Sequence, residues 1–247
     1  MSGFVVLVGA GPGNPKLITV AGLEVLRSAD VVVYDSLAGK ELLREAREGA
    51  ELIDVGKRGG RHKVEQSEIN RIIVERARSG STVVRLKGGD PFMFGRGGEE
   101  AEELRAAGVE VRVIPGVTSA IAAPALAGIP VTHRDHASFV TFVTGHESDE
   151  RGDERIDWKG LAKLGGTIVI LMGMARLGRN MERLIEGGLD PSTPVAVVRC
   201  GSRPEQRSVL ATAATIERRC REEGVGSPAV TVVGSVASLR DVLGDLR

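Results

Sequence analysis

Residues 4–34 read FVVLVGAGPGNPKLITVAGLEVLRSADVVVY and contain two short apolar runs, a glycine-rich turn and an amphipathic stretch. The apolar runs, residues 4–8 and 31–34, are rich in valine, which is typical of buried strands. Residues 17–26 carry apolar side chains at helical spacing. A strand, a helix and a second strand in this order predict an α/β fold with a largely parallel sheet.

The same alternation continues along the chain. Further strand-like runs or amphipathic stretches occur at residues 42–46, 52–55, 69–77, 83–86, 101–104, 109–114, 139–144, 167–172, 174–186, 195–199, 213–222 and 230–233. The rhythm pauses at Ile114-Pro115-Gly116, after which we expect a helix of small residues over 117–127. We therefore predict two α/β domains, residues 1–114 and 115–247.

The composition weighs against several classes of protein. The 33 basic and 33 acidic residues cancel, so no overall field attracts nucleic acid or an anionic membrane. Five Phe, one Tyr and one Trp are few for RNA recognition by base stacking. No apolar run approaches the ~20 residues of a membrane span, and the first residues lead into a strand rather than a signal peptide. We expect a cytoplasmic enzyme without nucleic-acid or membrane partners.

The cysteines and histidines do not form a familiar metal motif. Cys200 and Cys220 are too few for a disulfide framework or a zinc cluster. The spacing His133-x-x-His136, with His146 further on, could hold a metal, but no cysteine or carboxylate completes the set at a familiar interval. We expect no metal site.

Glycine accounts for 33 of the 247 residues, about twice its usual share. The first glycine loop, GAGPGNP at residues 9–15, follows a strand and opens a helix, as the phosphate turn of a dinucleotide fold does. A GxGxxG motif starting at Gly9 would need glycine where Asn14 stands, and Pro12 and Pro15 each lack an N–H for a pyrophosphate. The loop suits a ligand without phosphates, such as S-adenosylmethionine. A tight structural turn is the alternative.

Two more segments carry candidate binding residues. Residues 85–100, RLKGGDPFMFGRGGEE, place five glycines after another strand, which predicts close approach of backbone to a ligand. Residues 56–63, GKRGGRHK, form the densest basic run of a neutral chain. That run is either a solvated loop or a clamp for a polyanionic substrate.

Together these segments resemble one family closely. VGAGPGNPKLITVAGLEVLRSADVVVYDSL from Val8, GKRGGRHKVEQSEIN from Gly56, VVRLKGGDPFMFGRGGEE from Val83 and VIPGVTSAIAAPALAGIPVTHRD from Val113 look like the class III tetrapyrrole methylases that use S-adenosylmethionine. The GKRGG and THRD segments look most like the uroporphyrinogen III C-methyltransferases among them. The likeness covers nearly all of the chain and implies two α/β domains, a cofactor in the cleft between them and a homodimer.

The resemblance also implies site residues. The positions that would contact the cofactor are Pro12, Gly88, Gly89, Asp90, Met93, Thr118, Ser119, Met172 and Gly201. Taken without the family, Met93 and Met172 could be core residues. Thr118 and Ser119 could likewise be helix caps.

Asp35 aligns with the proton acceptor that is proposed for the family, and Lys57 with the proposed donor. Without the family, Asp35 could equally be an ordinary loop residue. The candidate contacts to a polycarboxylate substrate are Arg58, Arg61, Lys63, Arg96 and Arg134. For Arg96 the alternative is an ion pair with a nearby acid.

The implied reaction is the transfer of two methyl groups to rings A and B (C-2 and C-7) of uroporphyrinogen III, which gives precorrin-2 for siroheme or cobalamin. Two alternative functions are also compatible with the sequence. One is a regulatory module that binds a dinucleotide without chemistry. The other is a class III methylase that acts on RNA or on a modified histidine of a protein.

Overall fold

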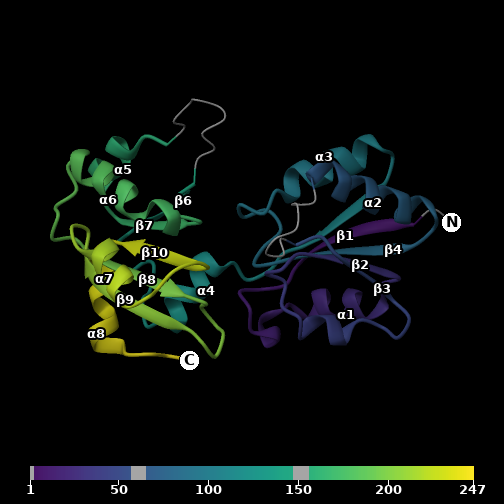
Figure 1. Ribbon diagram of the computed structural model, residues 1–247, viewed down its shortest axis with the longest axis horizontal. Helices are drawn as coiled ribbons and strands as arrows, with labels where there is room; N and C mark the ends of the chain where they lie inside the picture. Colours follow the sequence, from purple (N-terminus) through teal and green to yellow (C-terminus); the bar gives the residue numbers. More distant parts are fainter. Residues whose placement is uncertain (1–2, 57–64, 147–155) are drawn as a thin grey trace. The chain divides into compact units, whose positions relative to one another are not determined.

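The computed structural model describes residues 3–56, 65–146 and 156–247. The chain divides into two compact units, Met1–Thr118 (the first unit) and Ser119–Arg247 (the second unit), and each contains its own sheet (Figure 1). The boundary expected after residue 114 lies at the end of the last strand of the first unit, whereas the two units divide after Thr118.

The first unit has a five-stranded sheet in which every pairing is parallel, in the order β3-β2-β4-β1-β5. Its strands are β1 (Phe4–Gly9), β2 (Val31–Tyr34), β3 (Glu51–Asp54), β4 (Thr82–Lys87) and β5 (Glu110–Ile114). Its helices are α1 (Val20–Ser28), α2 (Gln66–Arg78) and α3 (Gly97–Ala106), with the 3-10 turns η1 (Pro15–Leu17) and η2 (Leu42–Glu45).

Both faces of this sheet are covered, which explains the unbroken valine runs of its strands. Val5 and Leu7 of β1 point to the face covered by α2 and α3, where they join Ile73 and Leu104. Val6 and Val8 point to the opposite face. There they pack in a cluster with Leu26 of α1 and Leu42 of η2.

The order of the strands creates a switch point between β1 and β4. The two strands are neighbours, but the helix that follows β1 covers one face of the sheet and the helix that follows β4 covers the other (Figure 1). In open α/β sheets the loops at such a point separate and form the usual ligand site. The two glycine loops are these loops.

The second unit has a five-stranded mixed sheet in the order β6-β7-β10-β8-β9. Its strands are β6 (Val140–Thr144), β7 (Thr167–Leu171), β8 (Pro194–Arg199), β9 (Arg207–Thr212) and β10 (Ala229–Val233). Helices α5 (Trp158–Leu164), α6 (Leu177–Glu186) and α7 (Ile216–Glu222) contribute to the core on one face. Helix α4 (Ser119–Leu126) and the turn η5 (Ser235–Leu239) contribute to the core on the other. The 3-10 turn η4 (Met174–Arg176) precedes α6, and α8 (Arg240–Leu243) follows η5.

The largely parallel sheet expected from the sequence is wrong for this second unit. Only β6 and β7 pair in parallel, whereas β10 is antiparallel to both β7 and β8, and β8 is antiparallel to β9. Strand β9 was not predicted from the sequence. A short connection of residues 200–206 joins β8 to β9, and so short a link allows only an antiparallel pair.

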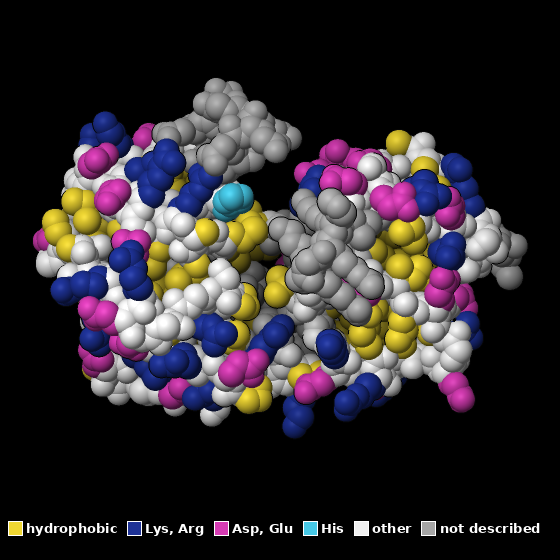
Figure 2. All heavy atoms as spheres, in the orientation of Figure 1, with side chains coloured by type: hydrophobic (Ala, Val, Ile, Leu, Met, Phe, Trp, Pro, Cys, Tyr) yellow, Lys and Arg dark blue, Asp and Glu magenta, His cyan; other side chains and the backbone are white. Residues whose placement is uncertain are grey.

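On the face drawn in Figure 2, Lys and Arg side chains are interspersed with Asp and Glu side chains, as the zero net charge suggests. No helix within the described residues has the length and apolar character that crossing a membrane requires. The rings of His133 and His136 lie 5.0 Å apart between centroids. In the described part of the chain, no group of three or more His, Cys, Asp or Glu side chains is arranged to hold a metal ion.

Candidate active site

The two glycine loops of the first unit are joined through their backbones. Gly11 N–H donates to the Gly89 carbonyl oxygen at 3.1 Å, and Gly89 N–H donates to the Gly11 carbonyl oxygen at 2.7 Å. Ala10 N–H donates to the Lys87 carbonyl oxygen at 2.8 Å. These amides are committed to the protein itself, so they are not available as a cradle for phosphates.

Asp90 organises the second loop. Its Oδ1 accepts hydrogen bonds from the backbone N–H groups of Phe92 at 2.8 Å and Met93 at 3.1 Å. Its Oδ2 accepts from the N–H of Gly116 at 3.0 Å. One carboxylate thus ties the loop after β4 to the segment after β5, which gives Asp90 a structural role beside any contact with a ligand.

Close approach of chain to chain explains part of the glycine excess. A Cβ on Gly9 would collide with the Gly116 backbone, and one on Gly116 would collide with the Gly89 carbonyl oxygen. A Cβ on Gly88 would lie 2.7 Å from the Cβ of Leu37. Bare backbone in the glycine loops was predicted to face a ligand, but these glycines also meet the protein's own backbone and side chains.

Arg96 lies at the N-terminus of α3 in the left-handed region, with φ of 60°. Its exposed guanidinium lies 3.3 Å from a carboxylate oxygen of Glu99. The ion pair named as the alternative role of Arg96 is therefore present, and a substrate carboxylate would compete with Glu99 for this cation.

Asp35 directly follows β2 at the carboxyl edge of the sheet. Its Oδ1 accepts the Leu37 backbone N–H at 3.0 Å, and its Oδ2 lies 4.0 Å from Nη2 of Arg85. The side chain is 29% exposed. The carboxylate is thus held in place on one side and accessible on the other, as a proton acceptor requires.

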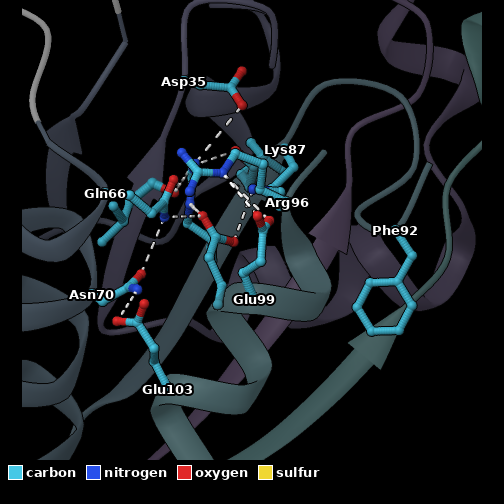
Figure 3. Close-up of polar contacts among 12 residues, drawn as sticks. Asp35, Gln66, Asn70, Lys87, Phe92, Arg96, Glu99 and Glu103 are labelled. Carbon is cyan, nitrogen blue, oxygen red and sulfur yellow. Dashed lines mark hydrogen bonds and ion pairs between the residues drawn. The ribbon is translucent and has the colours of Figure 1, made fainter. Parts of the chain in front are cut away.

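Next to Asp35 lies a cluster of buried charges formed by Arg85, Lys87 and Glu100, to which no role was assigned from the sequence (Asp35 and Lys87 are labelled in Figure 3). Glu100 Oε1 lies 3.2 Å from Arg85 Nε, and Glu100 Oε2 lies 2.8 Å from Lys87 Nζ. Burial opposes the charge on Glu100, yet the two neighbouring cations hold the pKa of Glu100 below its ordinary value. Burial, followed by the charge of Arg85, lowers the pKa of Lys87. The available signal was Arg85, a charged residue two positions after Val83 and therefore on the same face of the strand predicted over residues 83–86.

Gly56, the last described residue before the basic run, lies beside the loop that carries Asp35. A Cβ on Gly56 would collide with the backbone nitrogen of Ser36, so the two loops touch. Lys57, Arg58, Arg61 and Lys63 lie outside the described residues, and their predicted roles stay predictions.

The second unit carries the remaining candidates. Ser119 begins α4, directly after Thr118. Met172 follows β7, is 53% exposed and has φ of 55°. Gly201 follows β8, and a Cβ there would collide with the Cβ of Ala123 in α4. Because β7 and β8 point the same way, Met172 and Gly201 lie at the same edge of the sheet.

Arg134, a candidate contact to the substrate, is exposed in the loop before β6. That both units contribute to one cofactor site stays a prediction.

The charges of the side chains in the two glycine loops are also compatible with S-adenosylmethionine. Residues 9–15 carry no charged side chain, and residues 88–94 carry only the acidic Asp90. No cation in either segment opposes a positively charged sulfonium, and the committed amides disfavour a pyrophosphate.

Two α/β units and two glycine loops joined at a switch point are compatible with a methyltransferase of the tetrapyrrole methylase class, and the chain belongs to this family. The sequence model of the tetrapyrrole (corrin/porphyrin) methylases matches residues 5–217.

Similar proteins are found at high identity over nearly full length. The S-adenosyl-L-methionine-dependent uroporphyrinogen III methyltransferase of Methanosarcina barkeri is 54% identical over 99% of this chain and 96% of that protein. The uroporphyrinogen-III C-methyltransferase of Methanocaldococcus jannaschii is 50% identical over 98% of this chain and 99% of that protein. The crystal structure of uroporphyrin-III C-methyl transferase from Thermus thermophilus, complexed with S-adenyl homocysteine, has a TM-score of 0.80 at 38% identity and covers 96% of this chain and 100% of that one.

Proposed function

We propose that this chain transfers two methyl groups from S-adenosylmethionine to C-2 and C-7, on rings A and B of uroporphyrinogen III, and so produces precorrin-2 for siroheme and cobalamin synthesis. The observation that carries the proposal is the mutual pairing of Gly11 and Gly89, which joins the two glycine loops at the switch point and commits the amides of both residues to the protein itself. The named activity of the relatives from Methanosarcina barkeri and Methanocaldococcus jannaschii supports it.

S-adenosylmethionine, when bound, supplies an electrophilic methyl group. In the first unit Pro12, Gly88, Gly89, Asp90, Met93 and Thr118 would hold it, and in the second unit Ser119, Met172 and Gly201 would do so. These residues align the methyl group with a ring carbon and exclude water, and such alignment supplies much of the rate of a displacement.

After each methylation the macrocycle must lose a proton. Asp35 accepts it, because its carboxylate is held by Leu37 N–H and stays partly exposed. Lys57 supplies a proton elsewhere on the ring. The carboxylates of the substrate bind Arg58, Arg61, Lys63, Arg96 and Arg134, since guanidinium groups pair with carboxylates through two parallel hydrogen bonds.

A ligand panel tests the binding half of the proposal. S-adenosylhomocysteine at a hundred times its Kd should stabilise the protein by about 2.7 kcal/mol and raise the Tm accordingly, whereas a nicotinamide dinucleotide should leave the Tm unchanged. The reverse result would favour the regulatory dinucleotide module instead.

We further propose a cytoplasmic homodimer, in line with the family resemblance. Light scattering of the purified protein should give twice the chain mass of 26.1 kDa.

Methyl transfer from S-adenosylmethionine to RNA or to a protein, with none to the tetrapyrrole, would favour a class III methylase that acts on RNA or on a modified histidine.

A further inference from the structure

The proposed reaction uses Asp35 but leaves the buried charges behind it without a role. Val83, Arg85 and Lys87 share the face of β4 that α2 and α3 cover. Val83 belongs to the apolar core of that face, whereas Arg85 and Lys87 replace the core with two buried cations at the carboxyl end of the strand. Burying charges is costly unless each is paired, so the partners of these cations decide what the cluster holds in place.

Glu100 anchors the cluster. Its carboxylate is fully buried and accepts from Arg85 Nε at 3.2 Å, Lys87 Nζ at 2.8 Å and Gln66 Nε2 at 3.0 Å. Gln66 Nε2 also lies 3.2 Å from Oδ1 of Asn70, which in turn donates to Glu103 (Figure 3). Glu100 is therefore fixed to β4 and, through Gln66, to α2.

Arg85 is fixed in turn. Its Nε faces Glu100, and its Nη1 lies 3.4 Å from the carbonyl oxygens of Val33 and Leu86. This leaves Nη2 as the nitrogen nearest Asp35, with 4.0 Å between Nη2 and Oδ2. The planar guanidinium cannot rotate toward Asp35 or away from it without losing these contacts.

The distance of 4.0 Å suits a positioning role. At this range Arg85 attracts the Asp35 carboxylate but donates no short hydrogen bond to it, so the lone pairs of Oδ2 remain available for a substrate proton. The other oxygen is held by Leu37 N–H. The charges agree with this arrangement, because Arg85, Lys87 and Glu100 together carry one unmatched positive charge, which Asp35 balances.

We propose that Arg85, anchored by Glu100, is a positioning residue that orients the Asp35 carboxylate toward the proton it removes from the methylated tetrapyrrole. This inference rests on the proposed function. It assigns the buried charges of β4 and α3 to catalysis through Asp35, rather than to the stability of the fold alone.

A double-mutant cycle tests the proposal. Arg85→Lys keeps the buried positive charge but removes the planar guanidinium, which contacts Glu100 and Asp35 through different nitrogens. It should lower kcat about tenfold, because a small misplacement of the Asp35 carboxylate reduces the rate strongly. In the Asp35→Asn background the same change should lower the residual kcat less than about twofold, because the group it positions is gone. The KM for S-adenosylmethionine and the Kd for S-adenosylhomocysteine should be unchanged throughout.

A milder variant covers the case in which Arg85→Lys fails to fold. Gln66→Met removes one donor to Glu100 and leaves every charge in place, so it should lower kcat about twofold to threefold with Asp35 present and not in its absence. Arg76→Lys is the matched control, because Arg76 pairs with Glu51 at the opposite edge of the sheet. Its kcat should equal that of the unaltered protein in both backgrounds.

The outcomes separate the two claims. If the unaltered protein shows no transfer to uroporphyrinogen III, the proposed function fails, and the inference fails with it. If the unaltered protein is active but folded Arg85→Lys lowers kcat equally in both backgrounds, or not at all, the positioning role is overturned and the proposed function stands.

Discussion

Gly9 is a position where a single methyl group should disturb the candidate site. A Cβ there would collide with the Gly116 backbone and lie 2.7 Å from the Gly89 carbonyl oxygen. Neither neighbour is the end of a flexible side chain, so the backbone must shift. We expect Gly9→Ala to lower the free energy of unfolding by about 2 kcal/mol and to weaken S-adenosylhomocysteine binding, as measured by urea titration and calorimetry.

Gly98 offers the matched control in the same glycine-rich segment. A Cβ on Gly98 meets nothing within 4 Å, and the residue belongs to α3. Gly98→Ala should therefore leave ligand affinity unchanged and raise the free energy of unfolding by about 0.5 kcal/mol through helix propensity. Equal effects of the two substitutions would contradict the packing explanation for Gly9.

Arg61 tests the basic run as a substrate clamp. Removing its guanidinium takes away a partner for substrate carboxylates but none for the uncharged parts of the cofactor. Arg61→Ala should therefore weaken tetrapyrrole binding more than S-adenosylmethionine binding in calorimetry. An equal loss of both affinities would defeat the clamp.

At the scale of elements, the contact between β4 and α3 should depend on pH. Glu100→Gln leaves Arg85 and Lys87 without a buried anion, so we expect a loss of about 3 kcal/mol in the free energy of unfolding at pH 7. Because folding lowers the pKa of Glu100, its contribution is complete above the ordinary carboxyl pKa and is lost as the pH falls through the folded value. Urea titrations should show the gap between the two proteins closing in acid.

Glu99 is the neighbouring control. Its pairing with Arg96 is exposed on both sides, and exposed pairs contribute about 0–1 kcal/mol. Glu99→Gln should change the free energy of unfolding by less than about 0.5 kcal/mol at either pH. A loss at Glu100 that persists unchanged in acid would contradict the role of its charge.

Elements buried on both faces could be predicted from the sequence, whereas others could not. The valine-rich runs of β1, β2 and β4 can be recognised as strands from the sequence, because a strand covered on both faces does not alternate apolar with polar residues. The direction of β10 and the existence of β9 depend on pairing with distant strands, which local periodicity does not record. The pairing of Glu100 with Arg85 could not be predicted for the same reason, because the two side chains meet only when α3 packs on the sheet.

At the scale of the whole molecule, the net charge is zero and glycine is in excess, but the glycine loops and the basic run are concentrated in the first unit. The glycine loops meet at the switch point of the first unit, and the basic run begins after Gly56, which touches the Asp35 loop. The order and spacing of these motifs along the chain indicated the tetrapyrrole methylase family, because several motifs matched it together and not one alone. The contact of Gly11 with Gly89 could not be read from either loop alone, since a β-bridge between residues far apart in the chain forms only in the folded sheet.

The central claim is tested most directly by turnover. The purified protein, incubated anaerobically with uroporphyrinogen III and excess S-adenosylmethionine, should produce the chromophore of precorrin-2. Each tetrapyrrole should gain the mass of two methyl groups, with two molecules of S-adenosylhomocysteine released. Folded protein that binds S-adenosylhomocysteine yet leaves the mass and the spectrum of the tetrapyrrole unchanged would contradict the account.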